Sequence, residues 1–375
     1  MPSNRRWIES LSPWPEEFGL ERMERLLAEL GGPHRAFPAI QVVGTNGKTT
    51  TARLLEALLD AEGLVVGTYT SPHVLGWEER IRVGGEPADL EAVLERIRPA
   101  AEAVGSTQFE ALTAAALAEF AAARVDVAVV EAGLGGRLDA TNVLRAPVVV
   151  LTNVALEHTE VLGTTREAIA AEKLAVLSPG AVAVLGEGQW EEAARARGAA
   201  NVLVAGQSNL ALAIAAAETF LGRPVDPHAA EDVVVPGRLE RVGEAPLEIW
   251  DGAHNLAGVG WLLARLPTAR YVVVASILAD KDADGMLAAL AAVGDRLVAT
   301  QSSNPRALPA EELAQRAASF FAQAEAVPDP AAARVRAQGL AGEEGAVLVC
   351  GSLYLLSDLA AVRLPPVPWG ASASG

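Results

Sequence analysis

The chain has 375 residues, of which 51% are hydrophobic and 21% are charged, a balance typical of a globular protein with a substantial core. Its 30 basic and 47 acidic residues give a formal net charge of −17, which argues against nucleic acid or an anionic membrane surface as a partner. A single cysteine excludes a disulfide framework. Because the chain also shows neither a signal-peptide pattern nor an apolar run of membrane-spanning length, we expect a cytoplasmic protein.

Short Val-rich runs alternate with longer Ala/Leu-rich stretches of helical pattern. The predicted strands are 39–43, 65–69, 125–131, 147–152, 181–185, 202–205, 247–250, 271–276, 296–300 and 346–350. The predicted helices are 20–30, 48–62, 89–103, 107–124, 165–177, 209–221, 255–265, 284–293, 310–322 and 330–339. Apolar strands separated by helices indicate mostly parallel sheets covered on both faces, so the sequence predicts an α/β fold.

A break in this alternation predicts a domain boundary. Prolines interrupt the pattern between 224 and 237, and a new strand–helix alternation begins near Leu247. We therefore predict a first α/β domain over 1–236 and a smaller, Rossmann-like α/β domain over 237–375. The Pro- and Ser-rich end of the second domain, about 365–375, is predicted to be a disordered tail.

The turn after the first predicted strand reads Gly-Thr-Asn-Gly-Lys-Thr-Thr over 44–50. Backbone N–H groups and a helix N-terminus at such a turn hold phosphates, and glycines let the backbone approach them closely. Lys48 would reach the outer phosphates, and a hydroxyl of Thr49 or Thr50 would bind Mg²⁺. The Lys-Thr ending argues against an ordinary strand-to-helix turn. We therefore predict an ATP site formed by Gly44, Thr45, Asn46, Gly47, Lys48, Thr49 and Thr50.

Four further segments place polar groups where an α/β fold binds its ligands. The first two are Thr70-Ser71-Pro72-His73 and Phe109-Glu110. The third is a Gly-rich loop over 131–142, which follows a strand that ends in a carboxylate. The fourth is 152–159, and Lys173 follows its histidine by fifteen positions. Oxygen and imidazole ligands suited to Mg²⁺ or Mn²⁺ are offered by Thr50, Ser71, Glu110 and His158.

Simpler roles stay open for several of these residues. Glu110 also fits the capping box that Thr107 would begin, and Lys173 also fits a solvated helix face. His158 alone would fit a structural histidine, and Asp280 and Asp282 fit loop-capping positions. Residues without a motif are His34 and His228, which we expect at the surface, and Cys350, which we expect in a buried strand.

Taken in order, these segments resemble the folylpolyglutamate synthase/dihydrofolate synthase family of the Mur ligase superfamily. GTNGKTT, TSPH, FEALTAAA, VDVAVVEAGLGGRLDATNV, LTNVALEHTEVLGTT, PGRLE, DGAHN, DKD and GSLYL follow one another between about 18 and 360, and the short GxxGKT spacing is the superfamily's form. The resemblance implies an ADP-forming amide ligase. In that family ATP phosphorylates a folate or dihydropteroate carboxylate, the amine of glutamate attacks the acyl phosphate, and phosphate leaves.

The resemblance also implies roles for single residues. Catalytic roles fall on Lys48, Lys173, His158 and Arg238, with Lys173 resembling the lysine that the superfamily carbamylates. Metal ligands for one or two Mg²⁺ ions would be Thr50, Ser71, Glu110 and His158. Further nucleotide contacts would come from Arg238, Asp251 and His254 of the second domain, whereas Asn255 would cap a helix. Substrate contacts would come from Asp139, on the pterin, and from Asp280 and Asp282, near the glutamate.

The chain departs from the family pattern at three places. Thr49 stands where the family has glycine, and Glu157 replaces the usual aspartate before the histidine. Lys173 and Asn209 are only 36 positions apart, a segment in which the family has extra strands, so we expect most of that subdomain to be missing.

Two alternative functions follow from these departures. The GTNGKTT ending is commoner in cell-wall Mur ligases, but we expect no additional N-terminal UDP-sugar domain here, which counts against that alternative. A non-catalytic ATP-binding descendant is the other alternative, but Lys48, Glu110, His158 and Lys173 are all present. For the leading hypothesis we expect small-molecule substrates, no nucleic acid or membrane partner, and a monomer.

Overall fold

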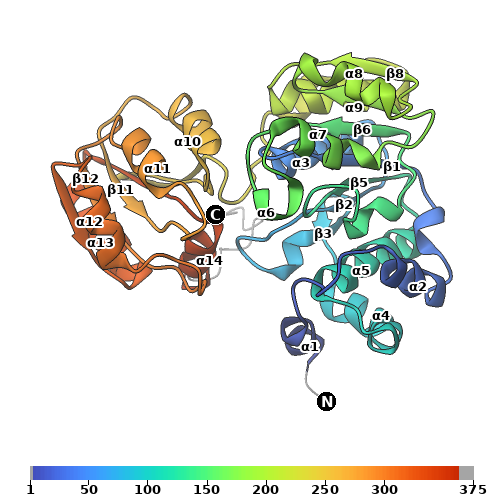
Figure 1. Ribbon diagram of the computed structural model, residues 1–375, viewed down its shortest axis with the longest axis horizontal. Helices are drawn as coiled ribbons and strands as arrows, with labels where there is room; N and C mark the ends of the chain where they lie inside the picture. The colour runs from blue at the N-terminus through green and yellow to red at the C-terminus, as the bar shows by residue number, and fades with distance from the viewer. Residues whose placement is uncertain (1–2, 363–375) are drawn as a thin grey trace, which may run out of the picture. The chain divides into compact units, whose positions relative to one another are not determined.

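Figure 1 shows the computed structural model, which describes residues 3–362. The chain divides into two compact units, Met1–Val235 and Pro236–Gly375. The tail predicted at about 365–375 lies outside the described residues. Within residues 3–362, no helix is both long and apolar enough to cross a membrane.

The first unit is built on an eight-stranded sheet with the order β4-β3-β2-β5-β1-β6-β7-β8. The strands are β1 (Ala39–Val43), β2 (Val66–Tyr69), β3 (Ile81–Val83), β4 (Glu86–Pro87), β5 (Val127–Glu131), β6 (Val148–Leu151), β7 (Val182–Leu185) and β8 (Asn201–Val204). The six neighbouring strands β2-β5-β1-β6-β7-β8 pair in parallel. The strands β3 and β4 form an antiparallel edge next to β2. The predicted parallel α/β fold is confirmed for this unit.

Helices cover both faces of this sheet. They are α1 (Asn4–Ser10), α2 (Glu21–Glu29), α3 (Lys48–Ala61), α4 (Leu90–Val104), α5 (Gln108–Ala123), α6 (Thr159–Leu162), α7 (Arg166–Lys173), α8 (Glu191–Ala196) and α9 (Asn209–Leu221). Side chains alternate along a strand, so Ile40 and Val42 of β1 share a core with α3 and α9, whereas Ala39 and Val43 share one with α4 and α5. Because both faces of β1 are covered, all five of its residues are buried.

Every strand predicted for the first unit is present to within two residues, but several short elements were missed. The hairpin of β3 and β4 and the short helices α1, α6 and α8 have too few residues to show a clear period. The segment between Lys173 and Asn209, expected to lack most of a subdomain, carries β7, α8 and β8. It therefore extends the parallel sheet by two strands.

The second unit contains a six-stranded sheet with the order β13-β12-β11-β14-β10-β9. Its strands are β9 (Glu240–Glu244), β10 (Leu247–Trp250), β11 (Tyr271–Ala275), β12 (Arg296–Ala299), β13 (Gln323–Ala326) and β14 (Ala346–Cys350). Its helices are α10 (Leu256–Leu263), α11 (Ala283–Leu290), α12 (Ala310–Ala317), α13 (Pro330–Ala341) and α14 (Leu353–Ala361). Only β9 is antiparallel to its neighbour, so this unit is also a mostly parallel α/β unit.

The second unit also corrects the sequence analysis. The helix predicted over 310–322 ends at Ala317, and β13 begins at Gln323, a strand that the polar sequence Gln-Ala-Glu-Ala gave no reason to expect. The elements β9 and α14 were missed as well. Cys350 lies fully buried in β14, as predicted.

Candidate active site

The loop from Gly44 to Gly47 joins β1 to α3 at the carboxyl end of the central strand. Gly44 and Gly47 have φ angles of 147° and 83°, which side-chain-bearing residues rarely adopt. A Cβ atom on Gly44 would also overlap Oγ1 of Thr152, and one on Gly47 would overlap the Asn209 side chain. The two glycines are therefore required by backbone conformation and by close packing together.

We expect Gly44→Ala to weaken ADP binding at least about tenfold, because the loop must shift to relieve the overlap with Thr152. Gly63→Ala is a matched control, since Gly63 has a φ of 83° but no atom within 4 Å of the added Cβ. The control variant loses only the stability that alanine costs at a positive φ, about 1–2 kcal/mol. Calorimetric titration with ADP, together with thermal unfolding, checks both effects. Equal ADP affinity in the two variants would contradict the argument.

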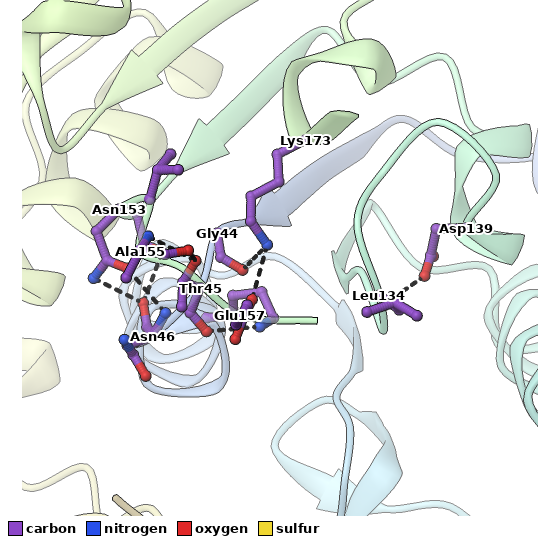
Figure 2. Close-up of polar contacts among 12 residues, drawn as sticks. Gly44, Thr45, Asn46, Leu134, Asp139, Asn153, Ala155, Glu157 and Lys173 are labelled. Carbon is purple, nitrogen blue, oxygen red and sulfur yellow. Dashed lines mark hydrogen bonds and ion pairs between the residues drawn. The ribbon is translucent and has the colours of Figure 1, made fainter. Parts of the chain in front are cut away.

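The loop is held in shape by the segment that follows β6 (Figure 2). Asn153 accepts a hydrogen bond from the Asn46 N–H (3.0 Å) and its own Nδ2 donates to the Asn46 carbonyl (3.3 Å). Thr45 bonds to the same segment, where its N–H donates to the Asn153 carbonyl (2.9 Å) and its hydroxyl accepts from the Ala155 N–H (3.1 Å). Asn153 stood inside a recognised motif, yet the sequence analysis assigned it no role. It acts here by preorganising the loop.

Two lysines lie against this loop. Nζ of Lys48 donates to the Thr45 carbonyl (3.1 Å). Nζ of Lys173 donates to the Gly44 carbonyl (2.8 Å) and forms an ion pair with Oε1 of Glu157 (3.1 Å), as Figure 2 shows. Lys173 is 1% exposed, so the alternative that it lies on a solvated helix face is wrong.

Burial is the largest influence on the Lys173 amine and lowers its pKa to about 8. Glu157 opposes this shift, and the positive charge of Lys48 adds to it. Burial alone would raise the pKa of the Glu157 carboxyl, but the two lysines outweigh it and hold that pKa below its ordinary value. A buried amine with so low a pKa is partly neutral near physiological pH, which is the form that reacts with carbon dioxide.

A second carboxylate, that of Glu131, lies beside the loop. Glu131 ends β5 and is 1% exposed, and its oxygens accept hydrogen bonds from the Thr49 hydroxyl (2.9 and 3.0 Å). The Ser71 N–H donates to the same carboxylate (3.1 Å). The structure thus brings Thr49, Ser71 and Glu131 together. The sequence analysis had noted that a carboxylate closes this strand but had assigned it no role.

Glu110, by contrast, is engaged elsewhere. Its Oε2 accepts hydrogen bonds from the N–H and the hydroxyl of Thr107 (2.8 Å each), so the capping-box interpretation is confirmed. Its carboxylate also pairs with Nε of Arg22 (2.8 Å). Within residues 3–362 no group of three or more His, Cys, Asp or Glu side chains is arranged to hold a metal ion. None of the Glu110 contacts supports the predicted metal-ligand role.

The remaining predicted ligands lie in varied settings. His158 is exposed and precedes α6 in a left-handed conformation with a φ of 45°. It lies close enough to Glu157 for its charge to contribute to the low pKa of that carboxyl. Thr50 lies in the first turn of α3, where it is partly buried.

Asp139 holds its own loop together. Its carboxylate accepts hydrogen bonds from the N–H groups of Leu134 (2.8 Å) and Thr141 (3.0 Å), and from the Thr141 hydroxyl (2.5 Å). Burial raises the pKa of the Asp139 carboxyl even though these bonds act in the opposite direction. A small cavity beside it is lined by Trp14, Phe18, Phe109, Glu110, Leu138 and Asp139, among others.

In the second unit, Asp251 and Asn255 have local structural contacts. The Asp251 carboxylate is buried and accepts from the N–H groups of Leu239 (2.7 Å) and Ala253 (2.8 Å). Burial raises the pKa of Asp251, and the nearby Arg238 charge opposes this shift. His254 bonds through Nδ1 to the Gly252 carbonyl (2.8 Å), and Asn255 caps α10, as expected.

Asp280 and Asp282 make different contacts: the first forms ion pairs and the second caps a helix. Asp280 forms ion pairs with Lys281 (3.2 Å) and Arg306 (3.5 Å), which lower the pKa of its carboxyl although burial acts to raise it. Asp282 caps α11 by accepting from the Gly285 N–H (3.0 Å), so its predicted capping role is confirmed.

His73, which follows Ser71, is held in its neutral form. Nε of Arg80 donates to Nδ1 of His73 (2.9 Å), and burial together with the Arg80 charge lowers the His73 pKa to about 3. The unfolded chain, with an ordinary histidine pKa, binds this proton as the pH falls through about 6.5, whereas the folded chain does not. Stability linked to His73 is therefore complete above about pH 6.5 and is lost progressively below it.

We expect His73→Gln to reduce the fall in the free energy of unfolding between pH 7 and pH 5 by about 1–2 kcal/mol. Glutamine keeps an acceptor for Arg80 but does not titrate. Urea unfolding of both proteins at the two pH values measures the difference. The exposed His228 serves as a control of opposite sign: Glu231 raises the pKa of His228, so His228→Gln should leave the fall unchanged or make it slightly larger. Identical pH dependence in His73→Gln and the parent protein would disprove the linkage.

Two family models match the two units in turn. The Mur ligase middle domain matches residues 42–220, and the Mur ligase, glutamate ligase domain matches residues 237–353. Together with the nucleotide loop at the end of β1, these matches define the protein as a ligase of the Mur type.

More specific relatives match nearly the whole chain. The dihydrofolate synthase/folylpolyglutamate synthase of Mycobacterium tuberculosis is 37% identical over 82% of this chain and 80% of its own length. The solved Escherichia coli FolC in complex with DHPP and ADP has a TM-score of 0.86 at 32% identity, covering 96% of this chain and 97% of that one. A bifunctional folylpolyglutamate synthase/dihydrofolate synthase with Mn, AMPPNP and L-glutamate bound has a TM-score of 0.85 at 32% identity, covering 95% and 96%. The chain belongs to the folylpolyglutamate synthase/dihydrofolate synthase family.

Proposed function

We propose that this protein is an ADP-forming ligase that joins L-glutamate to the carboxylate of a folate, with dihydropteroate as a second acceptor. The observation that carries the proposal is the loop from Gly44 to Gly47, with Lys48, Lys173 and the Glu131 carboxylate packed around it, in a chain of this family. The relatives above were solved with ADP, with DHPP and with L-glutamate, which supports small-molecule substrates of these classes.

The chemistry proceeds in two steps. An oxygen of the substrate carboxylate forms a bond to the γ-phosphorus of ATP as ADP leaves. The glutamate nitrogen, having lost its proton, then forms the amide bond to the acyl carbon as phosphate leaves. Lys48 stabilises negative charge on the phosphate oxygens during the first step, and the N–H groups at the start of α3 orient them.

The residues around the loop fit a magnesium ion. Mg²⁺ prefers oxygen ligands and is usually held by one or two carboxylates together with substrate phosphates. The Thr49 hydroxyl and the Glu131 carboxylate supply such oxygens beside the loop, next to Ser71. When bound, the ion would offset the repulsion between the γ-phosphate and the anionic substrate. We therefore assign its carboxylate ligand to Glu131 rather than Glu110, with Thr50, Ser71 and His158 retained as further candidates.

We propose that Lys173 is carbamylated in the active protein. The amine would add to carbon dioxide and lose a proton, which turns a cation into a carboxylate-like group. Its burial and its pKa of about 8 favour the neutral amine needed for this reaction. The ion pair with Glu157 is the contact that the modification would replace.

The cavity beside Asp139 has a volume of about 30 Å³, which is smaller than a pterin ring, so we propose that its walls open to receive the ring end of the folate. Trp14, Phe18 and Phe109 supply aromatic and apolar walls, and the loop from Leu134 to Asp139 forms a rim.

Arg238, Asp251 and His254 stay predicted nucleotide contacts of the second unit, and Asp280 a predicted contact near the glutamate. A monomeric, cytoplasmic enzyme is the form that we propose.

The test is phosphate release from ATP with Mg²⁺ and L-glutamate, with tetrahydrofolate, dihydropteroate or a UDP-muramoyl peptide supplied in turn. We expect turnover with tetrahydrofolate and not with the muramoyl peptide. Turnover with the peptide alone would establish a cell-wall ligase instead. No turnover with any acceptor, while ADP still binds, would favour a non-catalytic descendant. Analytical ultracentrifugation in the assay buffer tests whether the protein is a monomer.

A further inference from the structure

A cavity in the first unit lies away from the nucleotide loop. It has a volume of about 1100 Å³. Ala39, which lines it, is the first residue of β1, whereas the nucleotide loop follows the last residue of the same strand. The cavity therefore lies at the amino end of β1.

The other walls confirm this position. Leu144 and Arg145 lead into β6, and Leu177 and Ser178 lead into β7. Because β1, β6 and β7 are parallel neighbours, their amino ends share one edge of the sheet. Ligands of the ATP-dependent reaction bind at the opposite, carboxyl edge of such a sheet. The catalytic site consequently gives no explanation for this cavity.

The walls combine apolar surface with positive charge. Leu27, Phe37, Leu144 and Leu177 supply the apolar part. Arg35 and Arg145 line the same cavity and are exposed, and neither has an ion pair with a carboxylate among residues 3–362. Glu24 is the carboxylate on this wall. The chain has a net charge of −17, whereas this wall, with two arginines and one carboxylate, has a positive local charge.

His34 adds an independent observation. It also lines the cavity, and its Nδ1 atom is buried without a hydrogen-bond partner in the described structure. A buried polar atom left without a partner is uncommon in folded proteins, because it has lost its bond to water. The sequence analysis expected His34 at the surface, and the residue as a whole is partly exposed.

From these observations we propose that the cavity is a second ligand site, which binds a small anion carried on a flat apolar ring. The two arginines hold the anionic group. The apolar walls accept the ring. The volume suits a molecule of nucleotide size, and carboxylate and phosphate share the chemistry that this wall recognises.

The test uses three naphthalene probes on the full chain in the absence of nucleotide, and the variants below distinguish binding in the cavity from binding at the nucleotide loop. The probes are 1-naphthyl phosphate, naphthalene-2,6-dicarboxylate and the neutral naphthalene-2,6-dimethanol. Calorimetric titration gives each dissociation constant. We expect at least one of the two anions to bind at least about tenfold more tightly than the neutral diol. The stronger of the two identifies the anionic group.

Matched variants locate the binding. Arg35→Ala/Arg145→Ala removes both cations from the wall, and Arg6→Ala/Arg25→Ala removes two exposed arginines that do not line it. We expect the first pair to weaken anion binding at least about tenfold and the second pair to leave it unchanged. Ala28→Trp, which fills the cavity from an exposed position on its wall, should also weaken binding without changing the charge.

Thermal unfolding of each variant confirms that it is folded before titration. Three results would overturn the proposal: no binding of either anion at millimolar concentration, equal binding of the neutral diol, or equal anion affinity in the two arginine pairs. Because the altered arginines lie at the amino edge of the sheet, away from the nucleotide loop, these results do not depend on whether folate is the substrate.

Discussion

Glu131→Gln is expected to lower kcat/KM with ATP and Mg²⁺ by about a hundredfold or more. The carboxylate lies against Thr49 and Ser71 at the nucleotide loop, and we propose that its charge holds the cation. A bound metal ion contributes several kcal/mol to stabilising charge in phosphoryl transfer, and each 1.4 kcal/mol corresponds to a factor of about ten in rate. Glutamine keeps the size of the side chain and can still accept the two hydrogen bonds. The loss therefore reports on charge.

Glu110→Gln is the matched control, because it makes the same chemical change at the other carboxylate. There we expect kcat/KM for ATP, measured at saturating folate, to stay within about threefold, with a loss of stability from the broken ion pair to Arg22. Initial rates over a Mg²⁺ titration and thermal unfolding measure the two effects, and Mn²⁺ binding to the ADP complex gives a readout independent of turnover. If Glu110→Gln loses Mg²⁺ dependence and Glu131→Gln keeps it, the assignment is reversed.

Lys173→Ala is expected to lose about 99% of the activity or more, and to recover part of it when a short carboxylic acid such as acetate is added. A carbamylated lysine acts through a carboxylate-like group, and a diffusible carboxylate can occupy the space that alanine leaves. In the unmodified protein the same change also removes the cation that pairs with Glu157, which costs about 3–5 kcal/mol. Steady-state rates with and without acetate separate the two contributions, because acetate restores chemistry but carries no positive charge.

The double variant Lys173→Ala/Glu157→Ala serves as the control, since it removes both members of the ion pair. It should be more stable than Lys173→Ala and still respond to acetate. A further check uses the pKa of about 8: in limiting bicarbonate, the activity of the parent protein should rise between pH 7 and about pH 8 as the neutral amine increases. Full activity in Lys173→Ala without acetate would show that no carbamate is used.

Much of the architecture followed from periodicity. The β1 strand, the Gly-rich turn and α3 form one uninterrupted segment, so neighbouring residues suffice to predict them. The order of the motifs likewise identified the family. Periodicity missed short elements and edge strands. The strands β3 and β13 depend on pairing with a neighbouring strand, and α6 has too few residues to show a helical period.

The nucleotide loop, the parallel α/β class and the family can thus be read from the residues in sequence, because each depends on neighbouring positions or on motif order. Which carboxylate accompanies the loop could be decided only by the tertiary structure. Glu131 lies 82 positions from Thr49 and reaches it because β5 pairs with β1 in a register that sets Glu131 opposite Val42. Glu110, in a similar motif, is instead held by Thr107 and by Arg22, 88 positions away. Strand register and helix packing bring such pairs together, and neither is encoded by any local pattern.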